Sequence, residues 1–333
     1  MRPRPSLGLL LCSMLLLFAS RAGAETDWFA SLYTNEGVEL RADERVFALY
    51  ALLNGMGYDE APIIRTAPVP AREMHVVRLK VRSAVRMTAA DEEKLNAFFN
   101  AHPKPAEAYG RYALALKGPA GFERTSAAAA DLKGFEALLA EGFGKQKLAE
   151  LFTSVQDEYR SALKGYHGVV DAPVGAVRRL LKMKEDEAPR VVLVVNLLDG
   201  QGKSYSALSG DELWVVVGPS KMPDLFAVAR ELARARIEPL AAARAPDLES
   251  AALITETLTR AVASAALAMP DAEIDAQGQR DGFPQLREWV RQVEAFSKGD
   301  KALDSFVSEA VPMLQKEAGK ELPATVKKPS KAK

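Results

Sequence analysis

ELWVVVGPSKMPDLFAVARELARARIEPL, residues 212–240, is the stretch of sequence that decides the fold. Its first part is rich in β-branched residues and predicts a buried strand. Its second part, residues 226–240, has the apolar spacing of a helix, with Ser220 as the predicted N-cap and Pro239 as the predicted end. A strand that leads directly into a long helix predicts an α+β core.

Two further runs of sequence have the character of strands. RVVLVVNLL, residues 190–198, is a continuous β-branched run, and it predicts a strand joined to residues 212–217 by a hairpin or a longer excursion. The intervening DGQGKS, residues 199–204, ends like a phosphate-binding loop but lacks its first glycine, so it predicts a turn. MHVVRLKVRSAVRM, residues 74–87, alternates apolar and basic residues, which predicts a strand with a basic-faced helix as the alternative.

The first half of the chain is otherwise helical in pattern. Apolar residues at helical spacing predict a helix over about 43–54. Thr88 and Asp91 have the spacing of a capping box and predict the start of another helix. Pro103 and Pro105 are expected to divide that region into two helices.

The N-terminal residues 1–24 have the organisation of a signal peptide. Arg2 and Arg4 precede an apolar stretch, and small residues end the segment at Ala24. Cys12, the only cysteine, lies within it, so disulfides and thiol chemistry are excluded from the mature chain. We therefore expect a secreted or periplasmic protein with no stable membrane span after cleavage.

The charge balance argues against one class of partner. The chain has 44 basic and 44 acidic residues, so it offers no electrostatic basis for nucleic-acid binding. The tail, residues 316–333, is rich in lysine with little to bury, and it predicts a disordered basic segment.

Arg230 and Arg234 bracket Glu231 with the spacing of the zinc-binding helix H-E-x-x-H, with both histidines replaced by arginine. Helical geometry places these three residues and Glu238 opposite the apolar stripe, where Glu231 can pair with Arg234 and Arg234 with Glu238. Spacing alone favours a solvated charged face. Arg236 falls on the apolar stripe, which the sequence does not explain. The residues of that stripe are Leu225, Val228, Ala229 and Leu232.

The order of elements around this helix resembles that of zincin metallopeptidases. A strand and a short turn precede it, and a further helix carrying ITETLTRAV, residues 254–262, follows. RELARARIEPL, residues 230–240, is similar to the active helix, approximately HEFSHSFVNPL, of an uncharacterised family of secreted bacterial proteins of unknown function. GMGYDEAP and FFNAHPKPA also resemble that family. The resemblance runs from about 40 to about 270 and is most specific over 211–262.

The resemblance implies roles for four residues: Arg230 and Arg234 at the two histidine ligand positions, Glu231 at the general-base position, and Glu256 at the third ligand position. Arginine stays protonated and has no lone pair for a cation, so no metal and no cofactor are expected. We instead predict that Arg230 or Arg234 reaches Glu256, and that fixed cations stand in the place of zinc.

These observations predict an α+β, zincin-like fold that is mostly helical, with a small mixed sheet beside the former active-site helix. The expected domain covers residues 25–315. It has a helical N-terminal part to about 188, a strand-helix core over about 189–270, and C-terminal helices over about 283–315.

The expected function is that of an exported, catalytically inactive zincin-like protein with a binding or structural role in the cell envelope. An extended peptide or a protein in the remnant cleft is the expected partner; a peptide would be held by strand addition along residues 212–217, with Trp214 and Val216 lining the groove. A buried core position for Trp214 is the alternative. Two other functions stay open: a hydrolase that uses Glu231 and Glu256 as a carboxylate pair, and a purely structural helical envelope protein.

Overall fold

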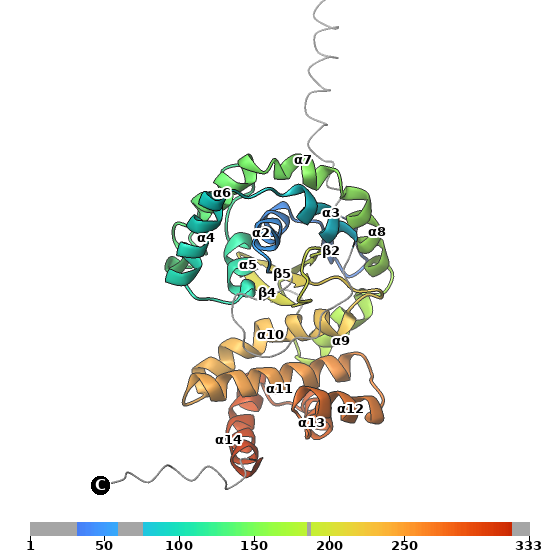
Figure 1. Cartoon of the computed structure of the whole chain (residues 1–333). Helices are drawn as coiled ribbons and strands as arrows, with labels where there is room; N and C mark the ends of the chain where they lie inside the picture. Colours follow the sequence, from blue (N-terminus) through green and yellow to red (C-terminus); the bar gives the residue numbers. More distant parts are fainter. Residues whose placement is uncertain (1–31, 59–75, 185–187, 322–333) are drawn as a thin grey trace, which may run out of the picture.

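The computed structural model describes residues 32–58, 76–184 and 188–321, so the predicted signal peptide and the last twelve or so residues of the predicted tail lie outside it. The described chain is α+β, mostly helical with one small mixed sheet, as predicted (Figure 1). The strands are β1 (Leu32–Tyr33), β2 (Glu39–Arg41), β3 (Arg190–Val195), β4 (Tyr205–Ser209) and β5 (Glu212–Val217). The helices are α2 (Glu44–Gly55), α3 (Val76–Ala84), α4 (Ala89–Ala101), α5 (Ala106–Leu114), α6 (Phe135–Lys145), α7 (Leu148–Thr153), α8 (Gln156–His167), α9 (Asp171–Leu180), α10 (Leu225–Arg244), α11 (Leu248–Ala266), α12 (Asp271–Asp281), α13 (Leu286–Lys298) and α14 (Leu303–Glu321), with a single 3₁₀ turn η1 (Ala130–Leu132).

The sheet has five strands in the order β1-β2-β3-β5-β4. Strands β2, β3 and β5 run parallel, while β1 and β4 are antiparallel to their neighbours. The chain leaves β3 through the predicted turn and forms β4. It then returns as β5 through a tight hairpin in which Gly210 has a φ of 63°, a conformation that glycine adopts without steric cost. Strand β5 is therefore an interior strand, and β4 forms the edge.

The two faces of the sheet are covered by different parts of the chain (Figure 1). Helix α2 lies against one face, and α4, α6, α7 and α8 form an arc around it, with α3 and α5 inside the arc. Helix α10 crosses the other face, and α11 packs beneath α10 with the remaining C-terminal helices further out. The strand at the centre, β3, is buried along all but its first residue, which is typical of a strand covered on both faces.

Helix α2 forms the centre of the N-terminal half. Its N-cap, Asp43, accepts hydrogen bonds from the backbone N–H groups of Arg45 and Val46, which satisfies donors that lack partners within the helix. Every residue from Val46 to Asn54 is buried. The prediction of a helix over about 43–54 is confirmed.

The start and the end of α10 both differ from the prediction. Asp224, not Ser220, is the N-cap and accepts from the N–H of Ala227. Pro239 lies inside the helix, which continues to Arg244. The helix ends instead at Ala245, whose extended backbone, with ψ of 148°, is the conformation that the following Pro246 imposes.

Three other segments test the helical pattern. Residues 76–84 are a helix, not the favoured strand, because Val77 and Val81 bury one helical face at a spacing of four residues. The capping box of Thr88 and Asp91 is confirmed, and α4 and α5 are separated at Pro103 and Pro105 as predicted. Helix α12 lies in a stretch for which no helix was predicted, and α14 extends beyond the predicted boundary at 315.

Within the described ranges, none of the helices is both long enough and apolar enough to cross a membrane. The chain contains one cysteine and therefore no internal disulfide.

Candidate functional site

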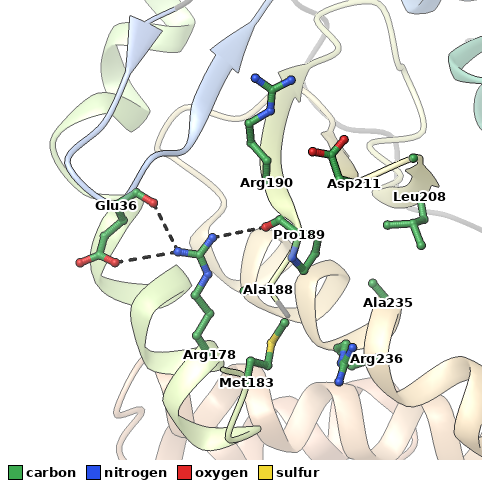
Figure 2. A pocket seen from close by; sticks show the side chains of 11 residues that line it. Glu36, Arg178, Met183, Ala188, Pro189, Arg190, Leu208, Asp211, Ala235 and Arg236 are labelled. Carbon is green, nitrogen blue, oxygen red and sulfur yellow. Dashed lines mark hydrogen bonds and ion pairs between the residues drawn. The ribbon is translucent and has the colours of Figure 1, made fainter. Parts of the chain in front are cut away.

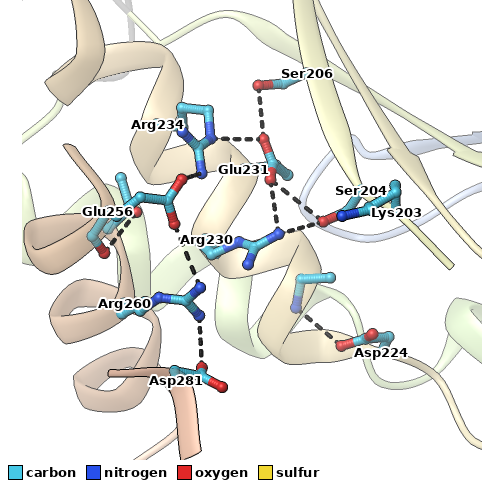
Figure 3. Close-up of polar contacts among 12 residues, drawn as sticks. Lys203, Ser204, Ser206, Asp224, Arg230, Glu231, Arg234, Glu256, Arg260 and Asp281 are labelled. Carbon is cyan, nitrogen blue, oxygen red and sulfur yellow. Dashed lines mark hydrogen bonds and ion pairs between the residues drawn. The ribbon is translucent and has the colours of Figure 1, made fainter. Parts of the chain in front are cut away.

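Six charged side chains from three consecutive helices form a chain of ion pairs beneath the sheet (Figure 3). Three are arginines and three are carboxylates, so their formal charges balance. Helix α10 contributes three of them, α11 two, and α12 one at its last residue. We call this the arginine–carboxylate cluster, and its members are Arg230, Glu231, Arg234, Glu256, Arg260 and Asp281.

Glu231 lies at the inner end of the cluster, and its residue is only 1% exposed. One carboxylate oxygen accepts from Arg230 Nη2 at 3.1 Å and Ser204 Oγ at 3.3 Å. The other accepts from Arg234 Nε at 3.1 Å and Ser206 Oγ at 3.3 Å. A buried carboxylate is costly unless it is paired and hydrogen-bonded, and here both oxygens are satisfied by one cation and one hydroxyl each.

Arg234 joins the two carboxylates that the zincin resemblance singled out. Its Nη2 lies 2.6 Å from Glu256 Oε1, while its Nε bonds Glu231. Burial opposes the charge of Arg234, but the two carboxylates outweigh burial and raise its pKa. Burial likewise works to raise the pKa of Glu256, and the neighbouring arginines, Arg234 first, hold that pKa below its usual value. Both groups therefore keep their charges.

Arg260 extends the cluster to the surface. Its guanidinium lies 3.4 Å from Glu256 Oε2 and 2.8 Å from Asp281 Oδ2. Burial, followed by the repulsion of Arg230, lowers the pKa of Arg260. The Nε groups of Arg230 and Arg260 are buried and have no hydrogen-bond partner among the described residues. Protein atoms therefore enclose these two groups.

The burial and contacts of these side chains decide between the two interpretations of the α10 spacing, a solvated charged face or a cluster that converges on Glu256. The solvated charged face is wrong, because Glu231 is buried and the side chains of Arg230 and Arg234 are only 19% and 12% exposed. The Glu231–Arg234 pair is confirmed, whereas Glu238 is exposed and makes no ion pair among the described residues. Arg234 does reach Glu256, so the predicted contact between these two side chains is observed.

The side chains of the cluster are not suited to metal binding or to acid–base catalysis. Arginine offers no lone pair to a cation, and among the described residues no group of three or more His, Cys, Asp or Glu side chains is placed to hold a metal ion. A carboxylate-pair hydrolase needs an acid and a base that reach a substrate. Glu231 is enclosed by four donors and Glu256 is bound by two arginines. The arrangement favours a structural role for both carboxylates over acid–base chemistry.

The expected groove on β5 is not present. Trp214 is only 4% exposed and Val216 is fully buried, both on the α2 face of the sheet. The Trp214 ring lies under the guanidiniums of Arg41 and Arg45, at 4.8 and 4.7 Å from its centroid, which are favourable cation–π distances. Because β3 and β5 pair on one side and β4 and β5 on the other, no peptide can add to β5.

Strand β4 provides the edge instead, and alternation shows which of its groups face outward. Asp211 O and Val217 O accept from β3, so the odd-numbered residues of β5 face β3 and the even-numbered ones face β4. Their partners in β4 are the odd-numbered residues, so Ser206 and Leu208 direct their backbone groups away from the sheet. Arg111 Nε donates to Ser206 O at 2.9 Å, and Leu208 is 62% exposed.

Helix α5 covers the first part of this edge. Gly110 allows the approach, because a Cβ at that position would lie 2.3 Å from the ring of Tyr205. The same helix carries Arg111. Within the described chain, the edge is therefore closed at Ser206 by a side chain and open at Leu208.

A second buried carboxylate lies in the turn between β3 and β4. Asp199 is fully buried and accepts from the N–H groups of Gln201 and Lys203 at 2.9 and 2.7 Å. Burial raises its pKa to about 6 against the opposing effect of these hydrogen bonds. The turn is held to the α2 side of the sheet by Asn54, whose amide donates to Leu198 O. Within the described chain, Asp199 has no cationic partner.

No family model, curated protein or solved structure matches the chain. The zincin resemblance therefore rests on the residues of α10 and α11 and stays a prediction.

Sequence reasoning found three arginine and glutamate positions on α10 and Glu256 on α11, but it missed the rest of the cluster. Arg260 lies four residues after Glu256, a spacing that indicates a pair on one helix face. Ser204 and Ser206 gave no signal, because nothing in the sequence indicates that β4 crosses α10. Asp281 lies in the helix that was not predicted.

Proposed function

We propose that the chain is an exported, zincin-like binding protein without peptidase chemistry, which holds an extended peptide along the edge of β4. One observation carries the first half of the proposal. The guanidinium of Arg234 lies between Glu231 and Glu256, at 3.1 and 2.6 Å. Both carboxylates at former zincin positions are thereby bound to a cation that cannot be displaced by pH and cannot activate water.

The proposed site for the peptide is the edge of β4, in place of the expected site on β5. Strand addition needs unpaired backbone groups at an exposed edge, and the outward N–H and C=O of Leu208 supply them beside an exposed side chain. The edge lies on the sheet beside α10, which carries the arginine–carboxylate cluster. The segment 1–24 supports export, because its pattern is that of a signal peptide.

Metal content and hydrolysis test the absence of peptidase chemistry. We expect the purified mature chain to contain no stoichiometric zinc by elemental analysis and to leave a casein-derived peptide mixture intact. Stoichiometric zinc, or cleavage that a chelator abolishes, would overturn this part of the proposal.

Restoring the histidines tests whether the arginines stand at former ligand positions. The double variant Arg230→His with Arg234→His presents two imidazoles four residues apart beside Glu256, which is the ligand set of a zincin site. We expect it to bind one Co²⁺ with the absorption spectrum of a tetrahedral site. The matched control is Arg230→Ala with Arg234→Ala, which removes the same ion pairs and adds no ligand. Equal Co²⁺ binding by both variants would count against the zincin geometry.

Strand addition is tested by substitutions at one position. Leu208→Pro removes the outward N–H from an edge strand, where proline is tolerated because that group makes no bond within the sheet. Leu208→Ala keeps the N–H and is the control. We expect Leu208→Pro to abolish binding to peptides selected from a random octapeptide library, with an unchanged melting temperature. Undiminished binding by Leu208→Pro would show that the peptide does not add to β4.

A further inference from the structure

A cavity of about 720 Å³ lies beside the open end of β4, where β3 and β5 begin and α9 and α10 pass below (Figure 2). Its volume is within the range of ligand sites. One wall is apolar, with Met183, Pro189 and Leu208. Three arginines also line the cavity: Arg178, Arg190 and Arg236. The exposed Leu208 of the β4 edge is thus also part of the cavity wall.

The three arginines differ in how fully they are engaged. Arg178 donates to the carbonyl oxygens of Glu36 and Pro189, and Arg190 forms an ion pair with Glu212. Arg236 makes no ion pair or hydrogen bond among the described residues, although it is only partly exposed. A partly exposed guanidinium that makes no ion pair within the described chain is available to bind an anion.

The planar guanidinium fork favours a carboxylate, and the apolar wall favours a ligand that also has a hydrocarbon part. The two acids that line the cavity among the described residues, Glu36 and Asp211, form no ion pair with Arg236: Glu36 faces Arg178, and Asp211 is exposed in the β4–β5 hairpin. The open edge of β4 supplies few backbone hydrogen bonds, because Arg111 already occupies Ser206 O. A peptide that adds at Leu208 therefore needs a side-chain anchor close by.

We propose that this cavity is a specificity pocket in which Arg236 binds a glutamate or aspartate side chain of the peptide that lies along β4. The inference rests on the proposed function. It adds a chemical class of partner: an extended acidic peptide, with the methylene groups of the acidic residue against the apolar wall and its carboxylate on the Arg236 guanidinium.

A random octapeptide library is selected against three proteins: the natural chain, Arg236→Gln, and Arg280→Gln as the control. Arg280 is an exposed arginine of α12, outside the cavity. We expect peptides enriched on the natural chain and on Arg280→Gln to carry Glu or Asp at one fixed position, and this preference to disappear with Arg236→Gln. A selected peptide and its Glu→Gln counterpart should differ about tenfold in Kd on the natural chain and not at all on Arg236→Gln.

The outcomes separate the two proposals. Enrichment without an acidic preference, or a preference that survives Arg236→Gln, would overturn the pocket and leave strand addition at β4 in place. No enrichment over Leu208→Pro would overturn both. Circular dichroism and melting temperature of each variant establish that it is folded, so a lost preference is not a lost structure.

Discussion

Glu231 and Asp199 are both buried carboxylates, one on each side of the same sheet, and the protein treats them in opposite ways. Glu231 is surrounded by two arginines and two hydroxyls. Asp199 accepts only from backbone N–H donors among the described residues, and its pKa is raised to about 6. A carboxylate bound by cations stays charged in the interior, whereas one that only shapes a turn is free to take up a proton near neutral pH.

The largest expected effect is that of Glu231→Gln. This change removes the carboxylate that Arg230 pairs with and leaves Arg234 with Glu256 alone in a buried site, and we expect a loss of about 4 kcal/mol in the free energy of unfolding. Urea unfolding measures it. The control is Glu238→Gln, an exposed position on the same helix, for which we expect less than about 0.5 kcal/mol. Similar small losses for both variants would remove the contrast between Glu231 and a surface glutamate.

Removing one or both partners of the Arg234–Glu256 pair tests the energetic coupling within the cluster. Arg234→Met and Glu256→Leu should each destabilise by about 3 kcal/mol, because each leaves the remaining buried charges with one partner fewer. The double variant should cost less than the sum of the two, since it removes both charges and adds apolar volume. Additive losses in chemical denaturation would show that the two side chains do not act as a pair.

The pH dependence of stability should have opposite signs in the two regions. The folded pKa of Asp199, about 6, lies above its unfolded value of about 3.9. Its contribution is therefore fully present below pH ~4 and is lost as the pH rises through 6, a change on the order of 2 kcal/mol. The folded pKa of Glu256 is lowered, so its contribution is present above the unfolded pKa and is lost as the pH falls.

Asp199→Asn separates these two effects. The difference in unfolding free energy between the natural chain and Asp199→Asn should decrease between pH 4 and 6. In this interval only the natural chain releases a proton from residue 199 when it unfolds. Parallel stability curves for the two proteins across this interval would mean that Asp199 is not raised in pKa.

The smallest expected effect is that of Ser206→Ala, which removes one neutral donor from Glu231 and leaves both arginines in place. A hydrogen bond from a neutral donor to a charged group is worth about 1.5 to 3 kcal/mol, and at 3.3 Å the loss should be below that of Glu231→Gln. Ser220→Ala, in an exposed loop, provides the control. A loss equal to that of Glu231→Gln would show that the hydroxyls, not the arginines, keep Glu231 buried.

The elements of the core were predictable from local patterns, and their arrangement was not. β-Branched runs predicted β3 and β5, apolar residues at helical spacing predicted α2, and a capping box predicted the start of α4. Alternation misidentified α3, because Val77 and Val81 fit a period of two and a spacing of four equally well. Pro239 did not end α10, since the helix is anchored on both sides of it by buried Ile237 and Ala241.

In the candidate site too, the residues on α10 were predictable from local patterns, and their burial was not. The spacing of Arg230, Glu231 and Arg234 drew attention to α10, but helical geometry alone placed these charges in solvent. Burial depends on β4 crossing above the helix and α11 packing beneath it, which are contacts between segments far apart in sequence. Arg236 was noticed only as a misfit on an apolar stripe, and its cavity is lined by residues from α9, β3, β4, α10 and the segments between strands and helices.

The close contact of Gly110 with Tyr205 has a consequence for the behaviour of the chain in concentrated solution. An open sheet edge can join the edge of a second molecule and start irreversible self-association. Because Gly110 lets α5 lie over the start of β4, only a short length of edge is presented. Gly110→Val would push α5 away from the Tyr205 ring and lengthen that edge, so we expect this variant to precipitate on storage while its freshly prepared form is still folded.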